Sequence, residues 1–415
     1  MLFAELILFT AAGCGCGIIT GLVPGIHINT VAAFVLALLP VLAVFEPVSV
    51  AALLIAMSVT HTFLDFIPST LFGAPDGETA LSVLPGHRML LEGRAIEAIK
   101  ITGLGSLVSL LITAALFGLM VGAVPQIYSA LKPRLHYLLL LIVLMSLAGE
   151  KKVIAAAAVF LLAGMFGFVV LGSGLFRSNM LFPALSGLFG VSTLYLSTRE
   201  KSILPTQVIA KADIGWFKVL KNSFLGAVAG MVVGVLPGIG AAQATYITQQ
   251  LTRGGSVKEF LVAVSGVNTS NIIFTLVVFY TIGKMRSGLV IAVNEVLPRF
   301  TPQVLLVFLG VVLLSGGIAM LLHMNIGTAL AKWLGSRNPQ QYSRISWAII
   351  ALIVGMVFVL CGALGIAVLV VGFAIGLIPP LAGVRRAECM GFFLFPVMLF
   401  YFGASGMCYS FLGVR

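Results

Sequence analysis

The chain has 415 residues, of which 60% are hydrophobic and 9% are charged, and its formal net charge is +11. A soluble domain carries about 25% charged residues, so this composition excludes a soluble globular protein. The lysines and arginines are scattered through short loops, which is typical of connections between membrane helices and does not indicate a nucleic-acid partner. We therefore expect an all-α polytopic membrane protein with about 10–12 transmembrane or broken helices.

The first predicted helix, residues 2–23, carries glycines at every fourth position and ends at a Pro-Gly pair. Glycines at this spacing line one helix face and let a second helix approach to backbone contact. Proline lacks an amide donor and disfavours helical geometry in the residue before it, so the pair predicts a break in the membrane segment. The glycines are Gly13, Gly17 and Gly21, and the pair is Pro24-Gly25.

A second apolar run, residues 28–44, follows the break directly. The start of such a helix presents free amide donors and the positive end of the helix dipole, which favour an anion. The residues around this start are small or polar, and Asn29 or Thr30 can cap the new helix. We therefore expect substrate-binding groups at Gly25, His27, Asn29 and Thr30.

Residues 48–72 form an apolar segment with a polar cluster that includes His61, Thr62 and Asp65. Asp65 lies three residues after Thr62 and four residues after His61, so all three can share one helical face. A carboxylate deep in a membrane segment is expensive and normally faces a cavity or a partner, which favours a role in ion binding or coupling. The structural alternative is a buried His–Asp pair that holds two helices together.

Residues 68–84 include a stretch rich in glycine and proline that is too broken to span a membrane. We expect a re-entrant or unwound segment there, because irregular backbone at membrane depth survives only inside protein or beside water. An interfacial loop is the alternative. The chain then divides into a first membrane repeat at 1–198, a basic linker at 199–221 and a second membrane repeat at 222–415.

The second repeat begins with nearly the same motif as the first. Residues 230–239 match residues 17–26 at their glycines, proline and last isoleucine, with a constant offset. Hydrophobic segments broken at corresponding places in two halves, which are often inverted, are the best sequence indication of a transporter's binding site. We therefore expect further substrate-binding groups after the second Pro-Gly pair, at Gly238, Gly240 and Gln243.

A second polar cluster follows at nearly the position of the first, and it comprises Asn268, Thr269, Ser270 and Asn271. Amide oxygens, hydroxyls and freed backbone carbonyls are the oxygen ligands that hold sodium in transporters with broken helices. We therefore expect these residues to bind or couple a cation. Ordinary hydrogen bonding between helices is the alternative.

The rest of the second half consists of further apolar segments at 303–323, 345–362, 364–383 and 390–412. His323 lies at the end of the first of these, and we expect it to be an interface residue rather than a proton carrier.

Taken together, these motifs resemble the large membrane subunit of the tripartite tricarboxylate transporters, in the shorter form found among archaea. The resemblance implies a secondary permease, driven by an ion gradient, for carboxylate anions that an extracytoplasmic binding protein delivers. It also implies a small membrane subunit as a partner. The residues that carry it are Gly17 to Thr30, Pro85 to Ala95, Gly230 to Gly240, Asn268 and Asn271.

We expect an ion-coupled secondary transporter of the cell membrane that moves a small di- or tricarboxylate by alternating access, with Na+ or H+ as the coupling ion. The partners would be the anionic substrate and membrane lipid, with a homodimer as one candidate assembly. A translocase for a lipid-linked phosphate carrier is the alternative, because such families also aim amide donors at an anion. An intramembrane enzyme using His61 and Asp65 is disfavoured, because no nucleophile or metal constellation accompanies them.

Overall fold

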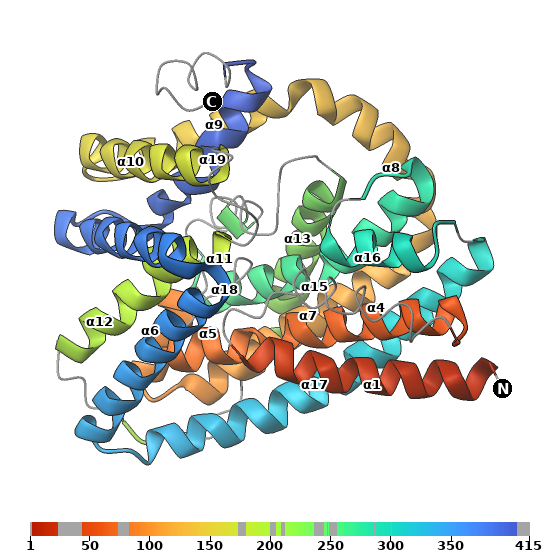
Figure 1. Cartoon of the computed structure of the whole chain (residues 1–415), viewed down its shortest axis with the longest axis horizontal. Coiled ribbons are helices and arrows are strands. Elements are labelled where there is room, and N and C mark those ends of the chain that lie inside the picture. The colour runs from red at the N-terminus through yellow and green to blue at the C-terminus, as the bar shows by residue number, and fades with distance from the viewer. Residues whose placement is uncertain are drawn as a thin grey trace.

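The computed structural model describes residues 2–23, 44–73, 83–172, 180–199, 205–208, 212–235, 245–246, 248, 255–285, 287–299 and 301–404. Every regular element in this part of the chain is a helix, which confirms the all-α class (Figure 1). The first half contains α1 (Leu2–Leu22), α4 (Pro47–Leu64), α5 (Phe66–Phe72), α6 (Val83–Leu91), α7 (Ala95–Ala115), α8 (Phe117–Leu131), η1 (Lys132–Arg134), α9 (Leu135–Ala148), α10 (Val153–Gly172), α11 (Leu181–Leu185), η2 (Ser186–Val191) and α12 (Ser192–Arg199). The second contains α13 (Trp216–Val235), α15 (Val257–Ile282), α16 (Gly288–Val296), α17 (Pro302–Gly335), α18 (Pro339–Ala382), η3 (Arg386–Met390) and α19 (Gly391–Tyr401).

Eight helices in the described ranges are long and apolar enough to cross a membrane. The number rises to nine if α8 and α9, which meet at 79°, form one broken span. The chain is therefore a multi-pass membrane protein. The count is lower than the predicted number of segments partly because α18 joins two predicted segments, and partly because the run after Pro24 lies outside the described residues.

Helix α18 is two helices that meet at Gly362, where φ is 64°. Glycine is needed there because a side chain disfavours positive φ. The two arms fold back on each other: the Tyr195 ring lies 6.4 Å from the Trp347 ring in the first arm and 5.4 Å from the Phe373 ring in the second. The sequence predicted two segments that meet at this point, and the kink confirms that boundary.

The glycine face of α1 packs against α4. A Cβ atom added at Gly17 would lie 2.7 Å from the Met57 carbonyl oxygen, and one at Gly21 would lie 2.8 Å from Leu64 Cβ. Residue numbers rise together along both helices, so the two helices are parallel. Helix α1 ends at Leu22, before the predicted break.

Helices α13 and α15 repeat this arrangement. A Cβ atom at Gly230 would lie 3.0 Å from the Val267 carbonyl oxygen, and one at Gly234 would lie 2.7 Å from Phe274 Cβ. The partner residues on α15 follow those on α4 at a constant offset in the chain, as the glycines do. The glycine contacts of the two pairs therefore correspond.

Helix α7 shows how the two pairs are oriented. Glu97 in its first turn forms an ion pair of 2.7 Å with Lys258 in the first turn of α15. Further along both helices, Ser109 lies against Gly266, so α7 and α15 are parallel. The start of α7 instead shares a hydrophobic cluster with α5 and the end of α4. Helix α4 is thus antiparallel to α7, and the α1–α4 pair runs opposite to the α13–α15 pair.

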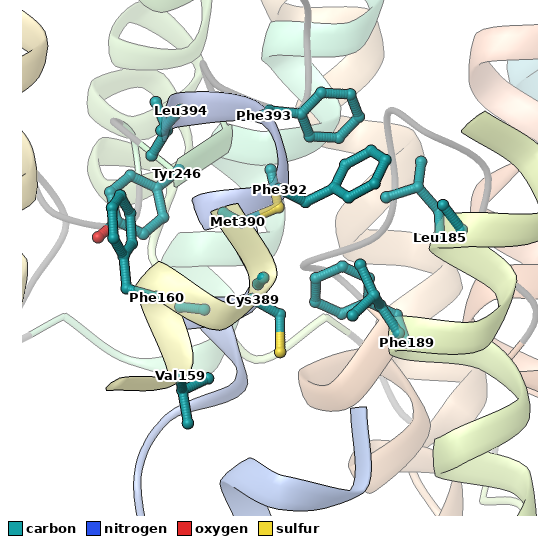
Figure 2. Close-up of a cluster of buried hydrophobic side chains, with 14 of the residues drawn as sticks. Val159, Phe160, Leu185, Phe189, Tyr246, Cys389, Met390, Phe392, Phe393 and Leu394 are labelled. Atoms are coloured by element: carbon teal, nitrogen blue, oxygen red, sulfur yellow. The ribbon is translucent and has the colours of Figure 1, made fainter. Parts of the chain in front are cut away.

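A second group of helices, on the left and at the top of Figure 1, comprises α9, α10, α12, α18 and α19. Its core includes residues of α10, α11, η2 and η3 (Figure 2). Backbones approach closely here as well, since a Cβ atom at Gly372 would lie 2.8 Å from the Ala184 carbonyl oxygen.

Helix α13 begins at Trp216, within the linker predicted at 199–221. Its first turn is held by an ion pair of 2.9 Å between Lys218 and Glu259 of α15. Lysines that the composition assigned to a loop therefore belong to a helix end.

Candidate functional site

The candidate site is centred on Asp65, which separates α4 from α5 within one apolar segment. Pro68 lacks an amide hydrogen, so the carbonyl of Leu64 loses its usual donor four residues on. Asp65 is 2% exposed. The break therefore places a carboxylate and a freed carbonyl group inside the span.

Asn268 of α15 contacts this carboxylate. Its Nδ2 atom donates a hydrogen bond of 2.8 Å to Asp65 Oδ2, and both side chains are buried. A hydrogen bond to an ionised group is stronger than one between neutral groups. The structure thus brings together one residue from each polar cluster that the sequence singled out.

Two amide oxygens of the second cluster lack a donor. The Oδ1 atoms of Asn268 and Asn271 are buried and have no hydrogen-bond partner among the described residues. Leaving an acceptor buried without a partner costs about 1–3 kcal/mol. A cation or a water molecule bound by these oxygens would remove that cost.

His61 lies against α1. Its Nδ1 atom is 3.1 Å from Thr20 Oγ1, and both residues are buried. The neighbouring Thr62 hydroxyl donates to the Val59 carbonyl of its own helix at 2.9 Å. The contact with Thr20 therefore places His61 at the α1–α4 interface, whereas the Thr62 hydroxyl bonds within α4.

The hydroxyls of the second cluster also bond to their own helix. Thr269 donates to the Ser265 carbonyl at 3.2 Å, and Ser270 donates to the Val267 carbonyl at 3.3 Å. The Ser270 hydroxyl also lies against Gly230 of α13, so this side chain faces α13. Among the described contacts of the predicted ion-binding residues, the one between Asp65 and Asn268 joins the two helix pairs.

The predicted substrate-binding residues lie outside the described part of the chain. The helices that lead to them, α1 and α13, are described as far as Leu22 and Val235. The anion site at these positions stays a prediction, and so do its members: Gly25, His27, Asn29, Thr30, Gly238, Gly240 and Gln243.

His323 does not lie at the end of its helix, as the predicted segment 303–323 implied. Helix α17 has 34 residues and continues to Gly335, so His323 lies in its interior and is fully buried. Its Nε2 atom bonds the Ile99 carbonyl of α7 at 2.8 Å and lies 3.2 Å from Thr102 Oγ1. The apolar residues that continue beyond it were the signal for a longer helix.

Two charged residues just before the last predicted apolar segment are also buried, which the sequence did not predict. Arg386 and Glu388 lie in η3, and they are 7% and 0% exposed. The Ser146 hydroxyl donates to Glu388 at 2.8 Å. Charged residues between two apolar segments usually indicate a solvated loop, so no local pattern predicted their burial.

Similarity to known proteins extends over most of the chain. The model of the tripartite tricarboxylate transporter TctA family matches residues 7–391. The chain is also 29% identical, over 405 residues, to an uncharacterised protein of Methanocaldococcus jannaschii, with 95% of this chain and 98% of the relative covered. No solved structure matches the chain.

Proposed function

Because this chain belongs to the tripartite tricarboxylate transporter TctA family, we propose that it is an ion-coupled secondary transporter for a small di- or tricarboxylate. The hydrogen bond between Asp65 and Asn268 is the observation that carries this proposal. It places a carboxylate inside a membrane span, at the contact between two helix pairs that run in opposite directions. Ionisable residues in such positions usually serve transport.

The two helix pairs would be inverted copies of one unit. Equivalent glycines meet equivalent partners in α1–α4 and in α13–α15, and the pairs are antiparallel to each other. Alternating access in such transporters is a rocking of repeated units around a fixed site. The contact between Asp65 and Asn268 lies where that movement would act.

The cation would bind or protonate at Asp65. A carboxylate with two nearby helices that carry amide and hydroxyl oxygens suits Na+ or H+. Asn268 would hold the carboxylate in place, and its unpartnered Oδ1 oxygen would serve as a ligand. His61, Thr62, Thr269, Ser270 and Asn271 would form the surroundings of the cation.

The anion would bind at the two Pro-Gly breaks. Helix starts after Gly25 and Gly238 would aim amide donors at its carboxylates. As a component of a tripartite transporter, the chain would work with a small membrane subunit and an extracytoplasmic binding protein.

Uptake into proteoliposomes tests the proposal. Labelled citrate, succinate and malate are offered under an Na+ gradient and, separately, under an H+ gradient. We expect uptake that depends on one gradient, and we expect Asp65→Asn to abolish it while the protein still inserts. Asp213→Asn is the matched control, because the Asp213 side chain is 96% exposed. Uptake that needs no gradient, or normal coupling in Asp65→Asn, would contradict the proposal.

A further inference from the structure

A buried arginine lies away from the central site. Arg386 opens η3, the short helix between α18 and α19. Figure 2 shows the last two residues of η3, Cys389 and Met390, between the α10 residues Val159 and Phe160 on one side and Phe189 of η2 on the other. Arg386 itself is also buried.

The partners of Arg386 are neutral. Its Nη1 atom donates to Ser192 Oγ at 3.2 Å and to Thr193 Oγ1. Each hydroxyl in turn donates a hydrogen bond to a carbonyl of η2. The Ser192 hydroxyl donates to the Leu188 carbonyl at 2.9 Å, and the Thr193 hydroxyl donates to the Phe189 carbonyl. The two hydroxyl oxygens therefore accept hydrogen bonds from the guanidinium, and neither carries a negative charge.

The nearby carboxylates pair with the neighbouring arginine, Arg385. Arg385 forms ion pairs with Glu150 and, at 3.6 Å, with Glu388. Arg386 forms no ion pair with any described residue, although it is 7% exposed and the Arg385 side chain is 34% exposed. A buried charge is unfavourable unless it is paired, and Arg386 has no counter-charge among the described residues.

The free edge of the guanidinium has the right shape for a carboxylate. Arginine has five N–H donors, and the hydrogen bonds within the described chain use Nη1 alone. The Nε and Nη2 donors form a fork that matches both oxygens of a carboxylate.

The core around Arg386 reaches the central site. The same hydrophobic cluster contains residues of η3 and also Phe66 and Val267. Each of these two is the chain neighbour of a residue in the buried hydrogen-bonded pair, Asp65 and Asn268. The helix that begins with Arg386 therefore packs into the same hydrophobic cluster as the chain neighbours of that pair.

We propose that Arg386 binds a carboxylate group of the transported anion through its Nε–Nη2 fork. This inference rests on the proposed function, because it assigns a substrate contact for carboxylate transport. The competing role is structural, in which Arg386 only holds η2 through the two hydroxyls. The two roles predict opposite effects on the protein without ligand.

The test combines thermal unfolding of the purified full-length chain with uptake into proteoliposomes, using citrate, succinate and malate as probes. We expect Arg386→Gln to unfold at the wild-type temperature or above it without ligand, and to lose the stabilisation that a transported carboxylate gives. We expect Arg386→Lys to raise KM by about tenfold or more, because lysine cannot form the fork. Arg385→Gln is the matched control, and it should lower the unfolding temperature yet keep the carboxylate response.

Three results would overturn the inference. In the first, Arg386→Gln keeps the wild-type KM and the wild-type response to carboxylates. In the second, it unfolds at a lower temperature without ligand, as a structural role requires. In the third, it loses a stabilisation given by phosphatidylglycerol and keeps the one given by carboxylates, which would make the site a lipid site. If the wild-type chain takes up none of the three probes under either gradient, the proposed function itself fails.

Discussion

The amide Nδ2 atom of Asn268 donates a hydrogen bond of 2.8 Å to Asp65 Oδ2, across 203 positions of the chain. The two residues belong to helix pairs that run in opposite directions, so a movement of one pair against the other must change this contact. A hydrogen bond to a charged group contributes about 1.5–3 kcal/mol. The contact is thus strong enough to bias a conformational equilibrium that a few kcal/mol can shift.

Exchange of the two side chains tests this coupling. Asn268→Asp places two carboxylates side by side, and we expect it to lower the free energy of unfolding by about 1–3 kcal/mol. The double variant with Asp65→Asn restores one carboxylate and one amide, and we expect it to recover most of that loss. Thermal unfolding of the four proteins gives the interaction free energy, for which we expect about 1–3 kcal/mol.

The control for this cycle uses a buried asparagine elsewhere. Asn222 of α13 donates to the Lys218 carbonyl at 2.8 Å. Asn222→Asp combined with Asp65→Asn should give additive losses of stability. Additivity in the Asp65–Asn268 cycle as well would show that the hydrogen bond contributes nothing specific.

Much of the fold could be predicted from local chemistry. The apolar runs and the glycine spacing predicted membrane helices and a close helix contact, and α1 does pack its glycine face on α4. The predicted segments 345–362 and 364–383 meet at the kink at Gly362. Asp65 and Asn268 were both recognised as candidates, because polar groups in an apolar run are few and conspicuous.

The partners of those polar residues could not be predicted. Which face of α15 meets α4 depends on tertiary packing. The sequence therefore did not distinguish among the four residues from Asn268 to Asn271 as candidate ion ligands. Ser270 turned out to face a glycine of α13. Arg386 was missed for a related reason, since burial of a charge depends on what covers it and not on its own neighbours in the chain.

The glycine contacts make a prediction for both helix pairs. Gly13 and Gly226 lie directly against the backbone carbonyls of Leu53 and Ala263, so an added methyl group would separate the helices. We expect Gly13→Ala and Gly226→Ala each to lower the free energy of unfolding by about 1–3 kcal/mol. Gly15→Ala is the control, because nothing lies within 4 Å of its Cβ position. Thermal unfolding that ranks Gly15→Ala with the other two would contradict the close packing.

Acid should weaken the contact between α6 and α18. Burial lowers the pKa of the His87 imidazole from 6.5 to about 4. Its Nδ1 atom donates to the Thr70 carbonyl at 3.2 Å, and its Nε2 atom accepts from the Tyr342 hydroxyl at 3.0 Å. The unfolded chain therefore binds more protons than the folded one between these two pH values, and stability falls as the pH falls through that window.

Between pH 7 and pH 5 we expect the free energy of unfolding to drop by about 2 kcal/mol through His87. His87→Gln should remove that part of the pH dependence, because glutamine does not titrate. His136→Gln, at a partly exposed position of α9, should leave it unchanged. An identical pH profile in wild type and His87→Gln, measured by thermal unfolding, would show that His87 is not responsible.

An ion cluster at the start of α7 should hold the two halves together. The Glu97 carboxylate lies 2.8 Å from Arg94 and 2.7 Å from Lys258, and it accepts from the backbone amide of Asp213. Its side chain is 3% exposed, so removal of its charge leaves Lys258 with a weaker partner in a place shielded from water. We expect Glu97→Gln to lower the free energy of unfolding by about 3 kcal/mol.

Glu92 provides the matched comparison, because it pairs with Arg88 at 3.0 Å on the surface and is 41% exposed. Exposed pairs contribute about 0–1 kcal/mol, so Glu92→Gln should change stability by no more than that. Added salt should reduce the small effect at Glu92 and leave most of the effect at Glu97, since screening acts chiefly on exposed charges. Equal losses in the two variants, at low and at high salt, would mean that the cluster is a surface feature and does not join α7 to α15.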